Sequence, residues 1–184
     1  MSPKSYTVSC LAVSGSLRQE SSNTSLLEAA AALVPEGMHI SIYRSIGELP
    51  HFSPDLDPDN IPSVNTWAEQ VRNSDGLIVS TPEYAHGLPG SLKNALDWLV
   101  GGDAFYNKPF MLLNASSRSA YARDSLVEIL STMSGVHIKE ASTTIHLLGR
   151  DPDEYFSIIQ RAHAEEIRTA LALFAGSIRE MRRA

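Results

Sequence analysis

Cysteine is nearly absent from this chain of 184 residues, since Cys10 is the only one and lies in an apolar segment. A single cysteine excludes an internal disulfide framework and a metal site built from cysteine ligands. The six histidines are scattered, without metal-ligand spacing and without an HExxH pattern. We therefore expect no metal site, and we expect Cys10 to be a small core residue.

Long hydrophobic runs and an excess of basic residues are also missing. No apolar segment approaches the roughly 20 residues of a membrane-spanning helix, and residues 1–20 lack the basic start and apolar centre of a signal peptide. The formal net charge is -6, with 15 Lys and Arg against 21 Asp and Glu, whereas a nucleic-acid surface needs clustered basic residues. We expect a cytoplasmic protein that binds neither nucleic acid nor membranes.

Strand-like and helix-like segments alternate along the chain. Strands are predicted over 6–14, 38–43, 76–80, 110–114 and 136–144, and helices over 24–33, 62–73, 91–100, 119–133 and about 153–178. Five strands alternating with five helices indicate an α/β fold, a parallel sheet with helices on both faces. No linker-like stretch divides the chain, so residues 1–184 are predicted to form a single domain. Residues 44–60 contain three prolines and are predicted to be a long irregular loop, which is often functional.

Three polar loops follow predicted strands: "SGSLRQESSN" from residue 14, "TPEYAHGLPG" from residue 81 and "ASSRSAYA" from residue 115. In parallel sheets, ligands bind beyond the carboxyl ends of the strands, near the point where the strand order reverses. We therefore expect these three loops to lie along one edge of the sheet and to form the binding site.

The first loop has the composition of a phosphate-binding turn. Gly15 is its only glycine, so it is not a dinucleotide fingerprint, and it lacks the Gly-Lys-Ser/Thr of a Walker A loop. Hydroxyl and amide side chains with an arginine, at the start of a helix, suit a terminal monophosphate. The candidates are Ser16, Arg18, Ser21, Ser22, Asn23 and Thr24. The alternative is that residues 21–24 are only helix caps, but one cap residue would suffice.

The second loop combines a Thr-Pro-Glu-Tyr turn with Gly87, Pro89 and Gly90. Main-chain N–H groups of a fixed turn can bond the polar edge of a flavin and stabilise the charge that develops on reduction. An ordinary turn with proline and glycine explains the same residues, so the loop by itself does not decide between the two interpretations. Gly-x-Ser-x-Gly is absent from the chain, which argues against a hydrolase with a nucleophilic serine.

Taken together, "GSLRQESSN" and "TPEYAHGLPGSLKNALDW" resemble the NADPH-dependent FMN reductase family of flavodoxin-like proteins. The similarity extends through "LPHFSPDLD" and "ASSRSAYA", and so covers most of the chain. The resemblance implies a flavodoxin-like three-layer sandwich with strand order 2-1-3-4-5. It implies an FMN phosphate on Ser16, Arg18, Ser21 or Ser22, Asn23 and Thr24, and a flavin ring at Pro82, Glu83, Tyr84, Ala85, His86 and Gly87, closed by Ser116 or Ser117.

The chain departs from this family pattern after the Glu-Tyr pair. Many relatives have Asn followed by Gly or Ser there, whereas this chain has Ala85 and His86, so a side-chain contact from Asn is absent. His86 is either a proton donor beside the flavin or an exposed turn residue. Arg118 either meets the phosphates of NADPH or pairs with a surface carboxylate, and the sequence favours neither.

The resemblance also implies an activity and an assembly. A hydride would pass from NADPH or NADH through FMN to a small-molecule acceptor such as a quinone, a flavin, an azo dye or a metal oxyanion, by a ping-pong mechanism. The alternatives are a non-enzymatic electron carrier with a protein redox partner and a flavin-free interaction domain, which the intact phosphate turn disfavours. A homodimer or homotetramer is expected through residues 92–100 and the loop carrying His51 and Phe52, with Trp98 as an anchor.

Overall fold

The computed structural model describes residues 6–147 and 149–183. The extreme ends of the predicted domain 1–184, and the start of the segment considered as a signal peptide, lie outside these residues. The strands are β1 (Val8–Ser14), β2 (Met38–Tyr43), β3 (Gly76–Ser80), β4 (Pro109–Asn114), β5 (Val136–His137) and β6 (Thr143–Thr144). The main helices are α1 (Ser22–Ala32), α2 (Pro62–Asn73), α3 (Gly90–Asp97), α4 (Ala120–Thr132), α5 (Tyr155–Ile158) and α6 (Ala164–Met181).

The strands form one parallel sheet in the order β2-β1-β3-β4-β5, with β6 paired to β4. This confirms the predicted flavodoxin-like order 2-1-3-4-5. β1 lies between β2 and β3, with Val8 opposite Met38 of β2 and Cys10 opposite Gly76 of β3. The order reverses between β1 and β3, which is where such sheets bind their ligands.

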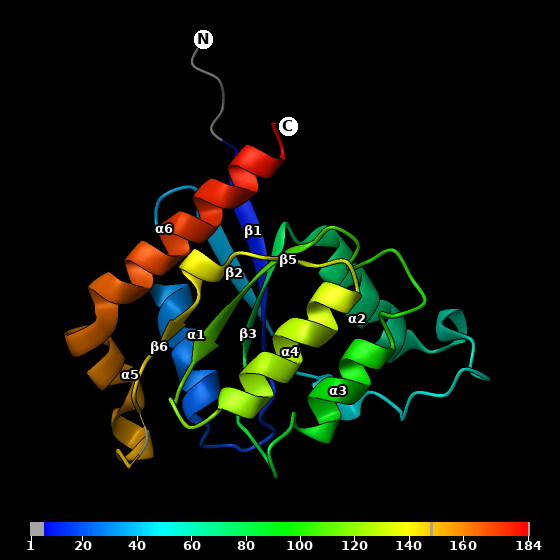
Figure 1. Cartoon of the computed structure of the whole chain (residues 1–184), viewed down its shortest axis with the longest axis horizontal. Helices are drawn as coiled ribbons and strands as arrows, with labels where there is room; N and C mark the ends of the chain where they lie inside the picture. The colour runs from blue at the N-terminus through cyan, green and yellow to red at the C-terminus, as the bar shows by residue number, and fades with distance from the viewer. Residues whose placement is uncertain (1–5, 148, 184) are drawn as a thin grey trace.

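Side chains of the central strands alternate between two hydrophobic clusters, one on each face of the sheet. Cys10 and Ala12 of β1 belong to the cluster that includes α1 and α6, whereas Leu11 and Val13 belong to the cluster that includes α2, α3 and α4. Figure 1 shows α1 and α6 on one side of the sheet and α2, α3 and α4 on the other. Burial on both faces explains why these strands are nearly continuous in their apolar character.

One predicted strand is divided. The segment 136–144 forms β5 and β6, with a 3-10 turn, η3 (Lys139–Ala141), between them. The Ser142 hydroxyl accepts a hydrogen bond of 3.0 Å from the backbone N–H of Leu112 in β4. A side chain thus replaces the main-chain partner that a continuous strand would offer to β4. Among the described residues the sheet therefore has six strands instead of the predicted five.

The C-terminal helix is also interrupted. A π-helical segment, η5 (Ile159–His163), separates α5 from α6, and α6 continues to Met181. The long loop 44–60 contains two short 3-10 turns, η1 (Ile46–Glu48) and η2 (Pro58–Asn60), and is otherwise irregular as predicted. A 3-10 turn, η4 (Pro152–Glu154), precedes α5.

Candidate functional site

The three polar loops lie at the carboxyl ends of β1, β3 and β4, at the lower end of the sheet in Figure 1. The first two are joined directly, because the N–H of Gly15 donates a hydrogen bond of 2.8 Å to the carbonyl of Ser80. A Cβ at Gly15 would lie 2.3 Å from Thr81 Oγ1, so a larger residue there would force the loops apart. Gly15 is therefore needed for the close approach of these two loops.

Hydroxyl groups organise the first loop from within. Ser14 Oγ accepts hydrogen bonds from the N–H of Ser16 at 3.2 Å and from the Thr24 hydroxyl at 3.0 Å. Ser21 is the N-cap of α1, and its Oγ accepts from the N–H of Thr24 at 3.3 Å. Only Ser21 of the four polar residues 21–24 is the N-cap, so capping alone does not explain the run.

Asn23 is buried behind the loop. Its Oδ1 accepts a hydrogen bond of 3.0 Å from the Ser80 hydroxyl at the end of β3. This bond ties the first turn of α1 to the neighbouring strand and fixes the orientation of the amide. Ser22, one residue earlier, is half-buried and does not line the cavity described next.

A cavity of about 300 Å³ opens beside the first loop. Its lining residues are Ser14, Ser16, Leu17, Arg18, Gln19, Thr24, Ile42, Tyr43, Arg44 and Ile46. Two of these carry guanidinium groups, and none of the described lining residues carries a carboxylate. A cavity with this donor set suits a phosphate dianion, which takes several charge-assisted hydrogen bonds. Three predicted phosphate-binding residues, Ser16, Arg18 and Thr24, line it together.

The second loop contains a tight two-residue turn. The N–H and carbonyl groups of Tyr84 and Gly87 bond each other reciprocally, both at 3.0 Å. Between them, Ala85 and His86 have φ angles of 50° and 59°, in the left-handed region. This is the pattern of a type I′ turn, for which Asn-Gly is the usual pair. Backbone strain of this kind is concentrated at functional sites.

The same loop is anchored to α4. Glu83 Oε2 accepts a hydrogen bond of 2.9 Å from the N–H of Ala122, and the His86 ring stacks on Tyr121 with 4.2 Å between centroids. In the third loop, Ser116 Oγ accepts from the N–H of Arg118 at 3.1 Å, while Ser117 and Arg118 are exposed. The structure thus brings the predicted ring-contact loops together around the start of α4.

Two residues near these loops were missed by the sequence analysis. Arg44 follows the end of β2 and lines the cavity beside the first loop with Arg18, and Tyr121 packs against His86. Arg44 could have been found, because β2 is predicted and its carboxyl end must share an edge with that of β1. Nothing in the sequence indicates that Tyr121 meets His86, since this contact depends on the turn geometry.

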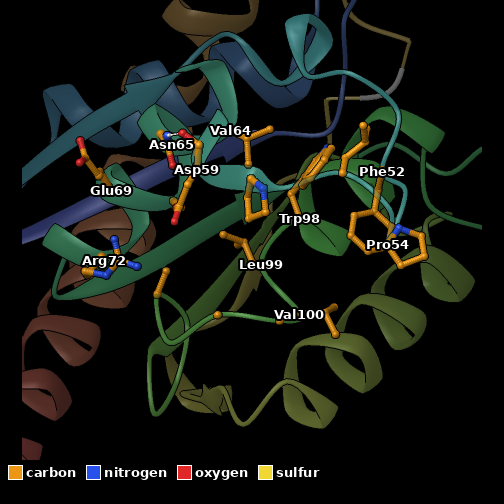
Figure 2. A pocket seen from close by; sticks show the side chains of 16 residues that line it. Phe52, Pro54, Asp59, Val64, Asn65, Glu69, Arg72, Trp98, Leu99 and Val100 are labelled. Atoms are coloured by element: carbon orange, nitrogen blue, oxygen red, sulfur yellow. Dashed lines mark hydrogen bonds between the residues drawn. The ribbon is translucent and has the colours of Figure 1, made fainter. Parts of the chain in front are cut away.

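A second, largely apolar cavity of about 590 Å³ lies between the long loop, α2 and the segment after α3. Figure 2 shows apolar side chains at one end of the cavity, namely Phe52, Pro54, Trp98 and Val100. Polar and charged side chains lie at the other end, namely Asp59, Asn65, Glu69 and Arg72. The Trp98 Nε1 group and the Asn94 amide both donate to the carbonyl of Pro50, at 2.8 and 2.9 Å. This second cavity shares no described lining residue with the cavity beside the first loop.

Two further features concern metals and membranes. In the part of the chain that the structure describes, no group of three or more His, Cys, Asp or Glu side chains is arranged to hold a metal ion. Among the helices within 6–147 and 149–183, none has both the length and the apolar character needed to cross a bilayer.

Comparison with known proteins gives three findings. The family model described as "NADPH-dependent FMN reductase" matches residues 8–147. A 2-hydroxy-1,4-benzoquinone reductase of Burkholderia sp is 38% identical over 107 residues, which are 56% of this chain and 58% of that protein. A quinone reductase of Escherichia coli is 38% identical over 120 residues, 63% of this chain and 62% of that protein. The matches therefore span about three fifths of the length of these relatives.

A solved structure resembles this chain over most of its length. It is the flavoenzyme NAD(P)H:(acceptor) oxidoreductase FerB from Paracoccus denitrificans, with a TM-score of 0.81, 24% sequence identity, and coverage of 95% of this chain and 98% of that one. At this level of identity, the likeness concerns the fold.

Proposed function

Because the chain belongs to the NADPH-dependent FMN reductase family, we propose that it is an NAD(P)H-dependent oxidoreductase that uses bound FMN to reduce a small acceptor. The observation that carries this proposal is the cavity beside the first loop, whose described lining residues include several hydroxyl side chains and two arginines and no carboxylate. The residues present fit the phosphate of FMN.

Ser16, Arg18 and Thr24 would hold the phosphate, with Ser21 and Asn23 fixing the first turn of α1 beneath it. Arg18 is exposed, so its guanidinium is free to move onto an anion, and the N–H of Arg18 donates to Ser16 Oγ at 3.3 Å. The start of α1 adds the partial positive charge of a helix N-terminus. Ser22 lies outside the cavity lining, so we assign it no direct phosphate contact.

The segment from Pro82 to Gly87 would support the flavin ring, with Ser116 and Ser117 on the third side. When bound, FMN accepts a hydride from a nicotinamide and passes two electrons to a second substrate. The chain's residues bind and orient it. The rigid turn at Ala85 and His86 presents main-chain groups at a fixed angle, and preorganised groups of this kind can stabilise developing charge.

We propose that the nicotinamide and the acceptor use the same open face in turn, in a ping-pong reaction. Tyr84 is 51% exposed and Tyr121 is 59% exposed, so this edge of the protein is accessible, which supports sequential use by two substrates. NAD(P)H would be oxidised to NAD(P)+ and leave, and a quinone, flavin, azo dye or metal oxyanion would then take the two electrons.

We also propose that the chain acts as a single domain within a homodimer or homotetramer. The apolar end of the second cavity supports this, because Phe52, Leu56 and Val100 expose 43%, 44% and 62% of their surfaces there. Light scattering at micromolar concentration tests the assembly, and a monomer mass would contradict it.

Flavin titration followed by rapid reduction tests the function. FMN should bind more tightly than FAD, because the loop suits one terminal phosphate, and Arg18→Ala should weaken FMN binding by about 1.5 to 3 kcal/mol.

NADPH or NADH alone should bleach the bound flavin anaerobically. Double-reciprocal plots of rate against NADPH concentration, at several quinone concentrations, should be parallel. Reduction by dithionite but by neither nicotinamide would favour an electron carrier, and intersecting plots would exclude the ping-pong mechanism.

A further inference from the structure

Arg44 lines the cavity beside the first loop although it lies outside that loop in the sequence. It follows directly after β2, which pairs with β1 in parallel through Val13 and Tyr43, so the two strands end side by side. The residues after these ends, including Arg18 from one and Arg44 from the other, line the same cavity. Two arginines from separate segments therefore line one small cavity.

The charge of this cavity is not balanced by its own walls. None of the described lining residues is acidic, and the remaining polar groups are hydroxyls and the Gln19 amide. Thr24, in the first turn of α1, also lines the cavity, and a helix N-terminus adds positive potential. An anion entering the cavity would therefore meet hydrogen-bond donors from several side chains.

Arg44 is held loosely in the structure. Its Nη2 lies 2.8 Å from Glu28 Oε1, in an ion pair whose side chains are 60% and 40% exposed. Exposed pairs of this kind contribute little to stability, whereas an arginine can bind a phosphate with two parallel hydrogen bonds. Exchanging Glu28 for a phosphate therefore costs little and adds a second guanidinium to the anion.

We propose that Arg18 and Arg44 form a two-arginine phosphate clamp, in which Arg44 is a phosphate-binding residue of the cavity. The proposal rests on the proposed function for the source of the phosphate, which is either the flavin or the nicotinamide dinucleotide. The chemistry is the same for both sources, namely a dianionic monophosphate held by two guanidinium groups.

Titration with FMN and with riboflavin, which lacks the phosphate, tests the clamp. Arg44→Gln should weaken FMN binding about tenfold or more, as expected for a hydrogen bond to a charged group, and leave riboflavin binding unchanged. Arg72→Gln is the matched control, because Arg72 also pairs with an exposed carboxylate, that of Asp103, but does not line this cavity. Glu28→Gln should bind FMN as tightly as the wild type or more tightly.

Steady-state kinetics with NADPH and with NADH distinguish the two sources of the phosphate. If Arg44→Gln leaves FMN binding intact but raises the KM for NADPH and not for NADH, the clamp holds the extra phosphate of NADPH. If neither FMN binding nor the KM for NADPH changes, the proposal that Arg44 binds a phosphate is wrong. Riboflavin binding and thermal unfolding of the variant report that it is folded. A wild-type chain that binds no flavin at all would overturn the proposed function, which is a separate outcome.

Discussion

The carboxylate of Glu83 accepts a hydrogen bond of 2.9 Å from the backbone N–H of Ala122 and so joins the loop after β3 to the first turn of α4. The N-cap residue of α4, Ser119, makes no side-chain capping bond. Glu83 therefore caps the helix from a distant part of the chain. Its side chain therefore positions the loop.

Glu83→Ala should lower the free energy of unfolding by about 1 to 2 kcal/mol, because the N–H of Ala122 loses its partner and the helix N-terminus loses a favourable negative charge. Urea unfolding of the flavin-free protein measures this. Glu128→Ala, an exposed position on the same helix, is the control and should change stability by less than about 0.5 kcal/mol. Equal midpoints for the two variants would show that the capping bond contributes nothing.

Ala85 has a φ of 50° in the turn between Tyr84 and Gly87, a conformation that is unfavourable for most L-residues and much less so for asparagine or glycine. Ala85→Asn should therefore raise the free energy of unfolding by about 0.5 to 1 kcal/mol, as expected for a residue suited to a type I′ turn. Ala172→Asn, at an exposed position inside α6, should instead lower the free energy of unfolding, because asparagine is a poorer helix former than alanine. Thermal unfolding of both variants tests the prediction, and destabilisation by Ala85→Asn would contradict it.

Much of the fold was predictable because its signals are local. The bounds of β2, β3 and α2 agree with the predicted ranges 38–43, 76–80 and 62–73. Pro62 begins a helix in the position that proline favours, and apolar runs of strand length mark the buried strands. The strand order came from the family resemblance, since residue patterns alone indicate only a parallel sheet.

The remaining features depend on contacts between distant residues. The division of 136–144 requires the Ser142 hydroxyl to reach Leu112, which no pattern within the segment reveals. The candidate site shows the same limit. Composition predicted a phosphate-binding turn, but the capping role of Glu83 and the position of Arg44 follow from how separate loops meet at the sheet edge.

His137 should make stability depend on pH. Its ring stacks on Phe110 with 4.8 Å between centroids, and its Nε2 lies 3.0 Å from Ser142 Oγ. Burial lowers the pKa of His137 below its ordinary value, so the unfolded chain takes up the proton first as the pH falls. Stability should therefore decrease as the pH drops through about 6.5, until the folded histidine is also protonated.

Urea unfolding between pH 8 and pH 5 measures this effect. His137→Gln should show a smaller loss of stability over that range than the wild type, because the residue that takes up its proton at a higher pH in the unfolded chain than in the folded chain is gone. His39→Gln, at an exposed position on β2, serves as the control, and its free energy of unfolding should change with pH as that of the wild type does. If the His137→Gln variant also shows the wild-type change, the pH dependence comes from other groups.

The stacked pair of His86 and Tyr121 should hold the strained turn against α4. The ring centroids are 4.2 Å apart with an interplanar angle of 22°, and aromatic pairs contribute about 0.5 to 1.5 kcal/mol beyond their buried area. Because both residues are exposed, we expect a coupling energy near the lower limit in a double-mutant cycle of His86→Ala and Tyr121→Ala. Tyr121→Phe keeps the ring and should retain most of the coupling.

Hydrogen exchange at the N–H of Gly87, which bonds the carbonyl of Tyr84, gives a local readout of the same stack. This exchange should accelerate in Tyr121→Ala and stay slow in Tyr121→Phe, because unstacking frees the turn to open. Additive single variants with unchanged exchange would mean that the turn keeps its shape without the stack.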